Sequence, residues 1–274
     1  MKDLAYQIRR IILEQSFRAG VGHIGSALSI ADILASVYGD VLRARSPRDK
    51  ERDVFILSKG HAALALYAAL YCRGWLSKKN LGTYCGDGTC LGVHPEHGLP
   101  GIECSTGSLG QGLSMGVGMA LALKMKRSKA RVFIVISDAE YNEGSLWEAA
   151  MFAAHHQLSN ICVIADNNGQ QAFGYTRDVL NVAPVENIWK AFGWGVYSVD
   201  GHDRLAITRT IRKSLKVKNS PHVIIANTQL GYGVSYMQRQ IKWHYWPMSD
   251  KEYGLALEDI KKVGLKKSHG IGRA

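Results

Sequence analysis

No stretch of this 274-residue sequence is long and apolar enough to cross a membrane. Residues 1–15, MKDLAYQIRRIILEQ, carry charged side chains where a secretory signal needs an apolar segment. The apolar side chains of this segment instead recur at helical spacing, which predicts an amphipathic helix with Leu4, Ile8, Ile11 and Ile12 on one face. These absences favour a soluble cytoplasmic protein with no membrane partner.

Cysteine is also scarce, and a long chain without a secretory signal does not predict a disulfide framework. The five cysteines are Cys72, Cys85, Cys90, Cys104 and Cys162. Three of them lie near His94 and His97 in the sequence, but their spacing lacks the paired Cys-x-x-Cys of structural zinc sites. Buried or incidental thiols are therefore the simpler interpretation.

Acidic residues are outnumbered, with 23 Asp and Glu against 34 Lys and Arg, which gives a formal net charge of +11. The basic residues are scattered, and the densest group is IKKVGLKKSHGIGRA at residues 260–274. A basic end punctuated by glycine is typical of a solvated tail, so we expect a domain over residues 1–262, a flexible tail over residues 263–274 and no nucleic-acid partner. A basic surface would also suit anionic sugar phosphates.

Apolar runs alternate with helical patterns along the chain. The strand-like runs are residues 53–58, 131–137, 161–166 and 222–227, and helix-like segments include residues 62–72, 108–126, 145–156 and 204–216. This alternation predicts one α/β domain, with a parallel sheet covered by helices on both faces. The long segment 80–107 is rich in Gly, Cys, His and Pro, which favours a functional loop.

Polar residues follow two of the predicted strands. Asp138 follows the run that ends at Ser137, and Asn168 and Gly169 follow the next run. Parallel strands would bring these side chains together at the carboxyl edge of the sheet, where such folds bind ligands. Mg²⁺ prefers hard oxygen ligands and completes its shell with diphosphate oxygens, although Asp and Asn also serve simply to end strands and cap turns.

Many ordered motifs then resemble the N-terminal, thiamine-diphosphate-binding half of transketolases over nearly the whole chain. They are GHIGSALSIADIL (22–34), LSKGHAALALYAAL (57–70), VHPE (93–96), STGSLGQGLSMGVGMALALK (105–124), EGSLWEAAMFAAHHQLSN (143–160), DNNG (166–169), FGWGVYSVDGHD (192–203) and GYGVSYM (231–237). The resemblance implies the thiamine-diphosphate-binding fold of that family.

The resemblance implies a role for each matching residue. Mg²⁺, for which Ca²⁺ or Mn²⁺ could substitute, would bind Asp138, Asn168 and the backbone carbonyl of Gln170. Catalytic roles fall on His23, His61, His94 and His244, with Glu143 coupling paired active sites. Contacts to thiamine diphosphate fall on His61, His94, Gly107, Ser108, Leu109, Gly110, Asp138, Ala139, Glu140 and Asn168.

The resemblance also implies a reaction and a partner. A two-carbon ketol unit would pass from a ketose to an aldose acceptor, with sugars or sugar phosphates as substrates. Full-length transketolases carry a second, pyrimidine-binding domain that this sequence does not show. We therefore expect a separate C-terminal-half subunit in an α2β2 assembly, and weak cofactor binding by this chain alone.

Three departures limit the transfer of roles, and one of them is the acidic turn EYNEG at residues 140–144. Ser137-Asp138-Ala139 stands where the family has Gly-Asp-Gly, and Ala139 would be strained if the turn required a positive φ. Tyr245 follows His244 where the family has glycine, and with Trp243 and Trp246 it would crowd a substrate entrance or pack on a partner. An E1-type subunit of a 2-oxo acid dehydrogenase and a non-catalytic scaffold paralogue remain alternatives.

Overall fold

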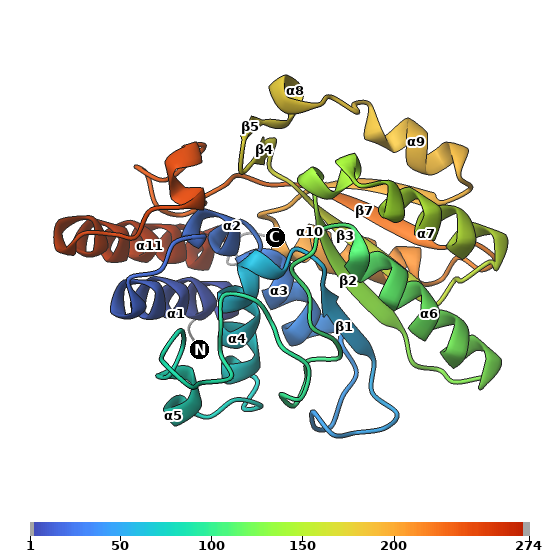
Figure 1. Cartoon of the computed structure of the whole chain (residues 1–274), viewed down its shortest axis with the longest axis horizontal. Coiled ribbons are helices and arrows are strands. Elements are labelled where there is room, and N and C mark those ends of the chain that lie inside the picture. Colours follow the sequence, from blue (N-terminus) through green and yellow to red (C-terminus); the bar gives the residue numbers. More distant parts are fainter. Residues whose placement is uncertain (1–2, 271–274) are drawn as a thin grey trace.

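The computed structural model describes residues 3–270 and contains a five-stranded parallel sheet (Figure 1). Its strand order is β1 (Val54–Leu57), β2 (Val132–Ser137), β3 (Ile161–Asn167), β7 (His222–Asn227) and β6 (Gly195–Asp200). The parallel sheet and the four expected strands are confirmed, while β6 was not predicted. All five carboxyl ends lie on one edge, where Ser137 of β2 pairs with Asp166 of β3.

Helices cover both faces of the sheet, as expected. One face carries α1 (Leu4–Ala19), α2 (Ile24–Ser29), α3 (Ala31–Ser36), α4 (Ala63–Cys72), α10 (Arg204–Ser214) and α11 (Asp250–Gly270); the other carries α6 (Gln111–Met125), α7 (Gly144–His155) and α9 (Val185–Ala191). The chain moves along the sheet from β1 to β3, skips to the edge strand β6 and returns to β7. Because crossover connections are right-handed, this reversal of direction places α10 on the face of the sheet opposite to α9.

The central strands are buried from both sides, which explains their continuous apolar sequences. In β2, Phe133 and Val135 belong to the core beneath α1 and α4, whereas Ile134 and Ile136 belong to the core beneath α6 and α7. Successive side chains of a strand point to opposite faces, so both sets must be apolar. The edge strand β6 is half-buried and has a mixed sequence.

Short elements connect these layers. They are the π-helical turn Val37–Val41, the 3₁₀ turns Gly60–Ala62, Asp138–Asn142 and Ile241–His244, the helices α5 (Lys78–Leu81) and α8 (Thr176–Val179), and the hairpin β4 (Gln170–Gln171) with β5 (Gly174–Tyr175). Most of the segment expected as a functional loop is irregular. Several of these short elements meet at the carboxyl edge of the sheet and build the candidate site.

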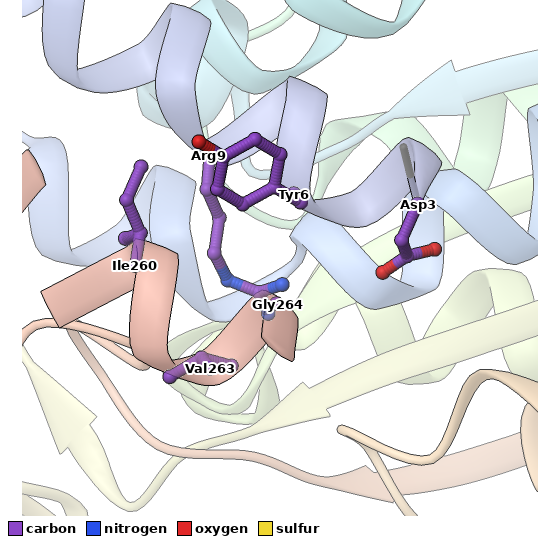
Figure 2. A pocket seen from close by; sticks show the side chains of 6 residues that line it. All are labelled: Asp3, Tyr6, Arg9, Ile260, Val263 and Gly264. Carbon is purple, nitrogen blue, oxygen red and sulfur yellow. The ribbon is translucent and has the colours of Figure 1, made fainter. Parts of the chain in front are cut away.

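The C-terminal helix α11 packs against α1. Figure 2 shows a shallow depression between the two helices, with Arg9 and Tyr6 of α1 facing Ile260 and Gly264 of α11. The expected domain boundary at residue 262 falls inside α11, so the backbone of residues 263–270 continues a helix, and residues 271–274 lie outside the described part. Residues 3–270 contain no helix with the length and apolar character of a membrane span.

The five cysteines are free thiols. In the described part of the chain, no three His, Cys, Asp or Glu side chains lie close enough together to hold a metal ion. The cysteines and histidines of the segment 85–104 therefore form no such group.

Candidate active site

The carboxylate and the carboxamide expected at the sheet edge lie close together. Asp138 begins the 3₁₀ turn after β2, and the backbone N–H of Gly169, in the turn after β3, donates to its Oδ2 at 2.6 Å. The other oxygen of Asp138, Oδ1, is buried without a hydrogen-bond partner. Burial and the neighbouring Asp166 carboxylate raise the pKa of Asp138 to about 7, so a cation at Oδ1 would stabilise the ionised form.

Asn168 lies in the same turn with its amide in a defined orientation. Its Nδ2 donates to Asp166 at 3.0 Å, and its Oδ1 accepts from the backbone N–H of Gln170 at 3.0 Å. Gly169 between them has φ 76°, a conformation that favours glycine. The Gln170 side chain donates to the backbone oxygen of Arg239 at 3.1 Å, which anchors β4 to the segment before the last 3₁₀ turn.

The altered Ser-Asp-Ala turn is well formed. Ser137 has φ −101°, and Ala139 lies in a 3₁₀ turn and is not among the positive-φ residues, so the strain considered for Ala139 does not arise. Glu140 closes a capping box with Ser137, whose backbone N–H donates to Oε2 at 2.8 Å. Its other oxygen accepts from the Ser58 hydroxyl and from the backbone N–H of Gly110 at 2.9 Å. The Glu140 carboxylate thus holds the turn itself together.

Three histidines from separate segments form a cluster. The ring centroids of His23 and His61 are 5.0 Å apart, and those of His61 and His94 are 4.3 Å apart. Burial, then the neighbouring His94 and His23, then Lys59, lower the pKa of His61 to about 4; burial, His94 and Lys59 also lower the pKa of His23. Both rings are therefore neutral at neutral pH and can accept a proton.

The segment 106–110 lies against this cluster. The Thr106 hydroxyl donates to the backbone oxygen of Leu57 at 2.6 Å, which ties the segment to the end of β1. Gly107 has φ 144°, and a Cβ there would lie 2.5 Å from Cδ2 of His94. Ser108 is exposed and Leu109 is half-buried. Gly110 adjoins Glu143, which is exposed at the start of α7.

His244 joins the site from the last 3₁₀ turn. Its backbone oxygen accepts from the N–H of His23 at 3.1 Å, and its Nδ1 is buried without a partner. Burial, then Lys59 and His23, lower its pKa to about 4. The structure corrects the expectation for Trp243, which is 2% exposed and packs on Tyr236 in the core.

The two aromatic residues after His244 are exposed. Tyr245 is 51% exposed, lies 6.2 Å from the His23 ring and donates its hydroxyl to the backbone oxygen of Ala172 at 2.7 Å. Trp246 is 60% exposed. Of the expected aromatic group, Tyr245 is the residue that borders the histidines.

Two buried residues of the site had no role assigned from sequence. Lys59 precedes the 3₁₀ turn that carries His61, and its ammonium pairs with Asp166 at the end of β3. Both lie within conspicuous motifs, LSKGH and DNNG. A lysine directly after an apolar strand and before a Gly-His turn is the available signal, because such a side chain must face the carboxyl edge of the sheet.

The oxygen ligands at this edge of the sheet fit a cation that binds a diphosphate. Asp138 keeps one buried oxygen free, Asn168 supplies an amide oxygen nearby, and both are hard ligands of the kind Mg²⁺ prefers. A parallel sheet with such residues and a histidine cluster at the carboxyl ends of its strands is the arrangement of α/β proteins that bind ligands at this edge.

Comparison with known proteins identifies the family. The model of the transketolase thiamine diphosphate binding domain matches residues 1–268, and the chain belongs to this family. An apulose-4-phosphate transketolase subunit of Actinobacillus succinogenes is 40% identical over 267 residues, which cover 95% of this chain and 96% of the relative. The 6-deoxy-6-sulfo-D-fructose transketolase subunit SqwG of Clostridium sp. is 37% identical, covering 96% of this chain and 98% of the relative.

Solved structures agree with this assignment. Transketolase from Campylobacter jejuni superposes with a TM-score of 0.89 at 28% identity, covering 94% of this chain but 42% of that chain. The chain thus matches subunit-type relatives over almost their full length and single-chain transketolases over less than half. The expected fold, family and transferase class are confirmed, and the comparisons favour transketolase over the E1-type alternative.

Proposed function

We propose that this chain is the diphosphate-binding subunit of a two-chain cytoplasmic enzyme that transfers a two-carbon ketol unit from a ketose to an aldose, with thiamine diphosphate and Mg²⁺. The observation that carries this proposal is the buried, unpartnered Oδ1 of Asp138, whose other oxygen accepts from the backbone N–H of Gly169, next to Asn168. Asp138, Asn168 and the Gln170 backbone would hold the cation. Bound thiamine diphosphate supplies the electron sink for breaking a carbon–carbon bond.

The protein's own contribution is to move protons and exclude water. His61 is half-buried and His244 is buried; both rings are neutral, and Nδ1 of His244 has no hydrogen-bond partner among the described residues. Each ring can take a proton from a sugar hydroxyl and return it when the ketol unit is joined to the acceptor. Glu143, which is exposed beside Gly110, would contact another subunit of the assembly.

The partner would be a subunit with the pyrimidine-binding domain, in an α2β2 assembly. Support comes from the relatives named as subunits, which this chain covers over more than 90% of their length. The test is to purify the chain with and without the product of a neighbouring partner gene and to assay ketol transfer from a ketose to an aldose. Full activity from this chain alone would refute the two-chain proposal.

Cofactor binding by the assembled complex distinguishes a catalytic role from a scaffold role. Calorimetric titration with thiamine diphosphate and Mg²⁺ is expected to show saturable binding, and no binding would refute a catalytic role. A parallel assay of 2-oxo acid decarboxylation tests the E1-type alternative. Activity there, without ketol transfer, would replace the proposal.

The substrate would be an uncommon ketose. Relatives are named for apulose-4-phosphate and 6-deoxy-6-sulfo-D-fructose, and here the Tyr245 ring borders His23. A panel of phosphorylated, sulfonated and unsubstituted ketoses, tested as donors with the complex, would identify the class. A clear preference for the common ketose phosphates would contradict this part of the proposal.

A further inference from the structure

Asp166 is the point where several segments of the site are joined. This fully buried carboxylate accepts from the hydroxyl of Ser29 on α2 at 2.7 Å and from the hydroxyl of Thr228, which follows β7. It also accepts from the Lys59 ammonium and from Nδ2 of Asn168 at 3.0 Å. One side chain therefore fixes four neighbours from different parts of the chain.

The contact with Asn168 decides which end of that amide faces the site. A carboxylate can only accept, so it must be met by the NH₂ group of Asn168. Oδ1 of Asn168 is then directed to the other side, toward the Gln170 backbone N–H. An amide turned the other way would oppose two oxygens at Asp166 and offer hydrogens to a cation. Asp166 thus fixes the amide orientation that would offer an oxygen to a cation.

The Lys59 ammonium balances the negative charge of Asp166. Asp138, Glu140 and Asp166 are all buried at this edge. Both oxygens of Glu140 accept hydrogen bonds from Ser58, Ser137 and Gly110, and Asp166 is paired with Lys59. Of these three carboxylates, Asp138 alone keeps an unpartnered oxygen.

We propose that Lys59 and Asp166 are a positioning pair for the cation site, in which Asp166 turns the Asn168 oxygen toward the cation and Lys59 cancels the charge of Asp166. The inference rests on the proposed function, since it concerns the same cation. Groups behind metal ligands commonly change metal affinity without touching the metal.

Substitutions that remove either charge test the pair, because the proposal predicts a different Mg²⁺ affinity for each of the two variants. In Asp166→Asn, an unpaired ammonium faces the site and Asn168 loses its carboxylate, so Mg²⁺ affinity falls about ten- to a hundredfold. In Lys59→Met, the carboxylate stays and still holds Asn168, so Mg²⁺ affinity is unchanged or higher although stability falls. The double variant lies between Asp166→Asn and the wild type, because the repulsion is gone but the orientation is not restored.

The measurement is calorimetric titration of Mg²⁺ into the complex with its partner subunit, at saturating thiamine diphosphate, together with thermal unfolding. Arg9→Met is the matched control, because Arg9 and Asp32 form another buried ion pair, on α1 and α3 (Figure 2 shows Arg9). It should lower the unfolding temperature and leave Mg²⁺ affinity unchanged. If Asp166→Asn does not fold, the double variant, which buries no unpaired charge, must still bind Mg²⁺ more weakly than the wild type.

The outcomes separate this inference from the proposed function. Equal weakening by Lys59→Met and Asp166→Asn would mean that the pair is merely structural, and wild-type affinity in Asp166→Asn would overturn the orienting role. In both cases, Mg²⁺ binding by the wild-type complex would still support the proposed function. If the wild-type complex binds no Mg²⁺, the proposed function and the positioning role fall together.

Discussion

Gly107 is a residue whose missing side chain makes room for a histidine of the site. Its φ of 144° and the 2.5 Å separation between an added Cβ and Cδ2 of His94 make Gly107→Ala both strained and obstructed. We expect a loss of about 1–3 kcal/mol in the free energy of unfolding and roughly tenfold weaker binding of thiamine diphosphate to the complex. Urea unfolding and calorimetry measure the two effects.

Gly98→Ala separates strain from obstruction. Gly98 lies in the same long loop with φ 107°, but an added Cβ would meet nothing within 4 Å. This variant should lose stability and keep wild-type cofactor affinity. Equal loss of affinity in both variants would show that His94 is not what Gly107 accommodates.

The neutral state of His61 makes the chain sensitive to acid. Its pKa is about 4 in the folded chain and about 6.5 when unfolded, so between these values the unfolded state binds more protons. The contribution of His61 to the free energy of unfolding should therefore be fully retained above about pH 6.5 and fall as the pH drops toward about 4. The slope stays below the limit of about 1.4 kcal/mol per pH unit for one proton, because the ring is partly solvated.

Urea unfolding at several pH values between 4.5 and 7.5 checks this dependence. His61→Gln should show a shallower slope than the wild type, whereas His155→Gln, at an exposed residue on α7, should not change it. An unaltered slope in His61→Gln would contradict the assignment of this sensitivity to His61.

The sequence predicted the positions of some site residues but not of others. Asp138 and Asn168 could be placed because the ends of parallel strands meet at one edge. Lys59 could not, because nothing in a linear pattern says that its ammonium will pair with a carboxylate more than one hundred residues away. The strain considered for Ala139 does not arise, because φ depends on the type of turn and this 3₁₀ turn needs no glycine.

At the scale of elements, the β4–β5 hairpin stands out as an apolar projection beside the site. Phe173 at its tip is 87% exposed, and Leu180, just after α8, is 57% exposed. The root of the hairpin is Gln170, whose backbone is one of the proposed cation ligands, and the Tyr245 hydroxyl donates to the hairpin turn at Ala172. A subunit that covers the cofactor would therefore also cover this hairpin.

We expect Phe173→Ser to weaken binding of the partner subunit by about 1–3 kcal/mol, as removal of an aromatic anchor does, while the isolated chain keeps its thermal stability. Biosensor affinity and thermal unfolding measure these quantities. Leu205→Ser, at a 55% exposed residue of α10, is the matched control and should leave partner binding unchanged. Undiminished partner binding by Phe173→Ser would place the partner elsewhere.

The elements themselves were predictable where burial is complete. The four predicted strands are buried on both faces, so their continuous apolar sequence was a clear signal. The strand β6, GVYSVD, is half-buried at the sheet edge and has no such run. The start of α6 was placed too early, because Gly107 and Gly110 have positive φ and delay the helix to Gln111.

For the whole molecule, the relation between this chain and its relatives matters most. It covers 96% and 98% of two relatives named as subunits but 40% of human transketolase. The described residues supply the proposed cation ligands and a histidine cluster. The β4–β5 hairpin, with the exposed Phe173 at its tip, lies beside the cation ligands. If the partner covers this edge, then cofactor binding and partner binding are coupled, and their coupling must be reciprocal.

We therefore expect the partner to tighten binding of thiamine diphosphate and Mg²⁺ by about a hundredfold, and the cofactor to tighten partner binding by the same factor. Calorimetry of cofactor binding with and without partner, and biosensor affinity of partner with and without cofactor, give the two ratios. Thiamine without its diphosphate is the control and should produce no coupling, because the proposed cation site acts through the diphosphate. Phe173→Ser should lower partner affinity in both states and leave the ratio unchanged, since Phe173 lies outside the proposed ligand set. Equal cofactor affinity of the isolated chain and the complex would show that the site is complete in this chain alone.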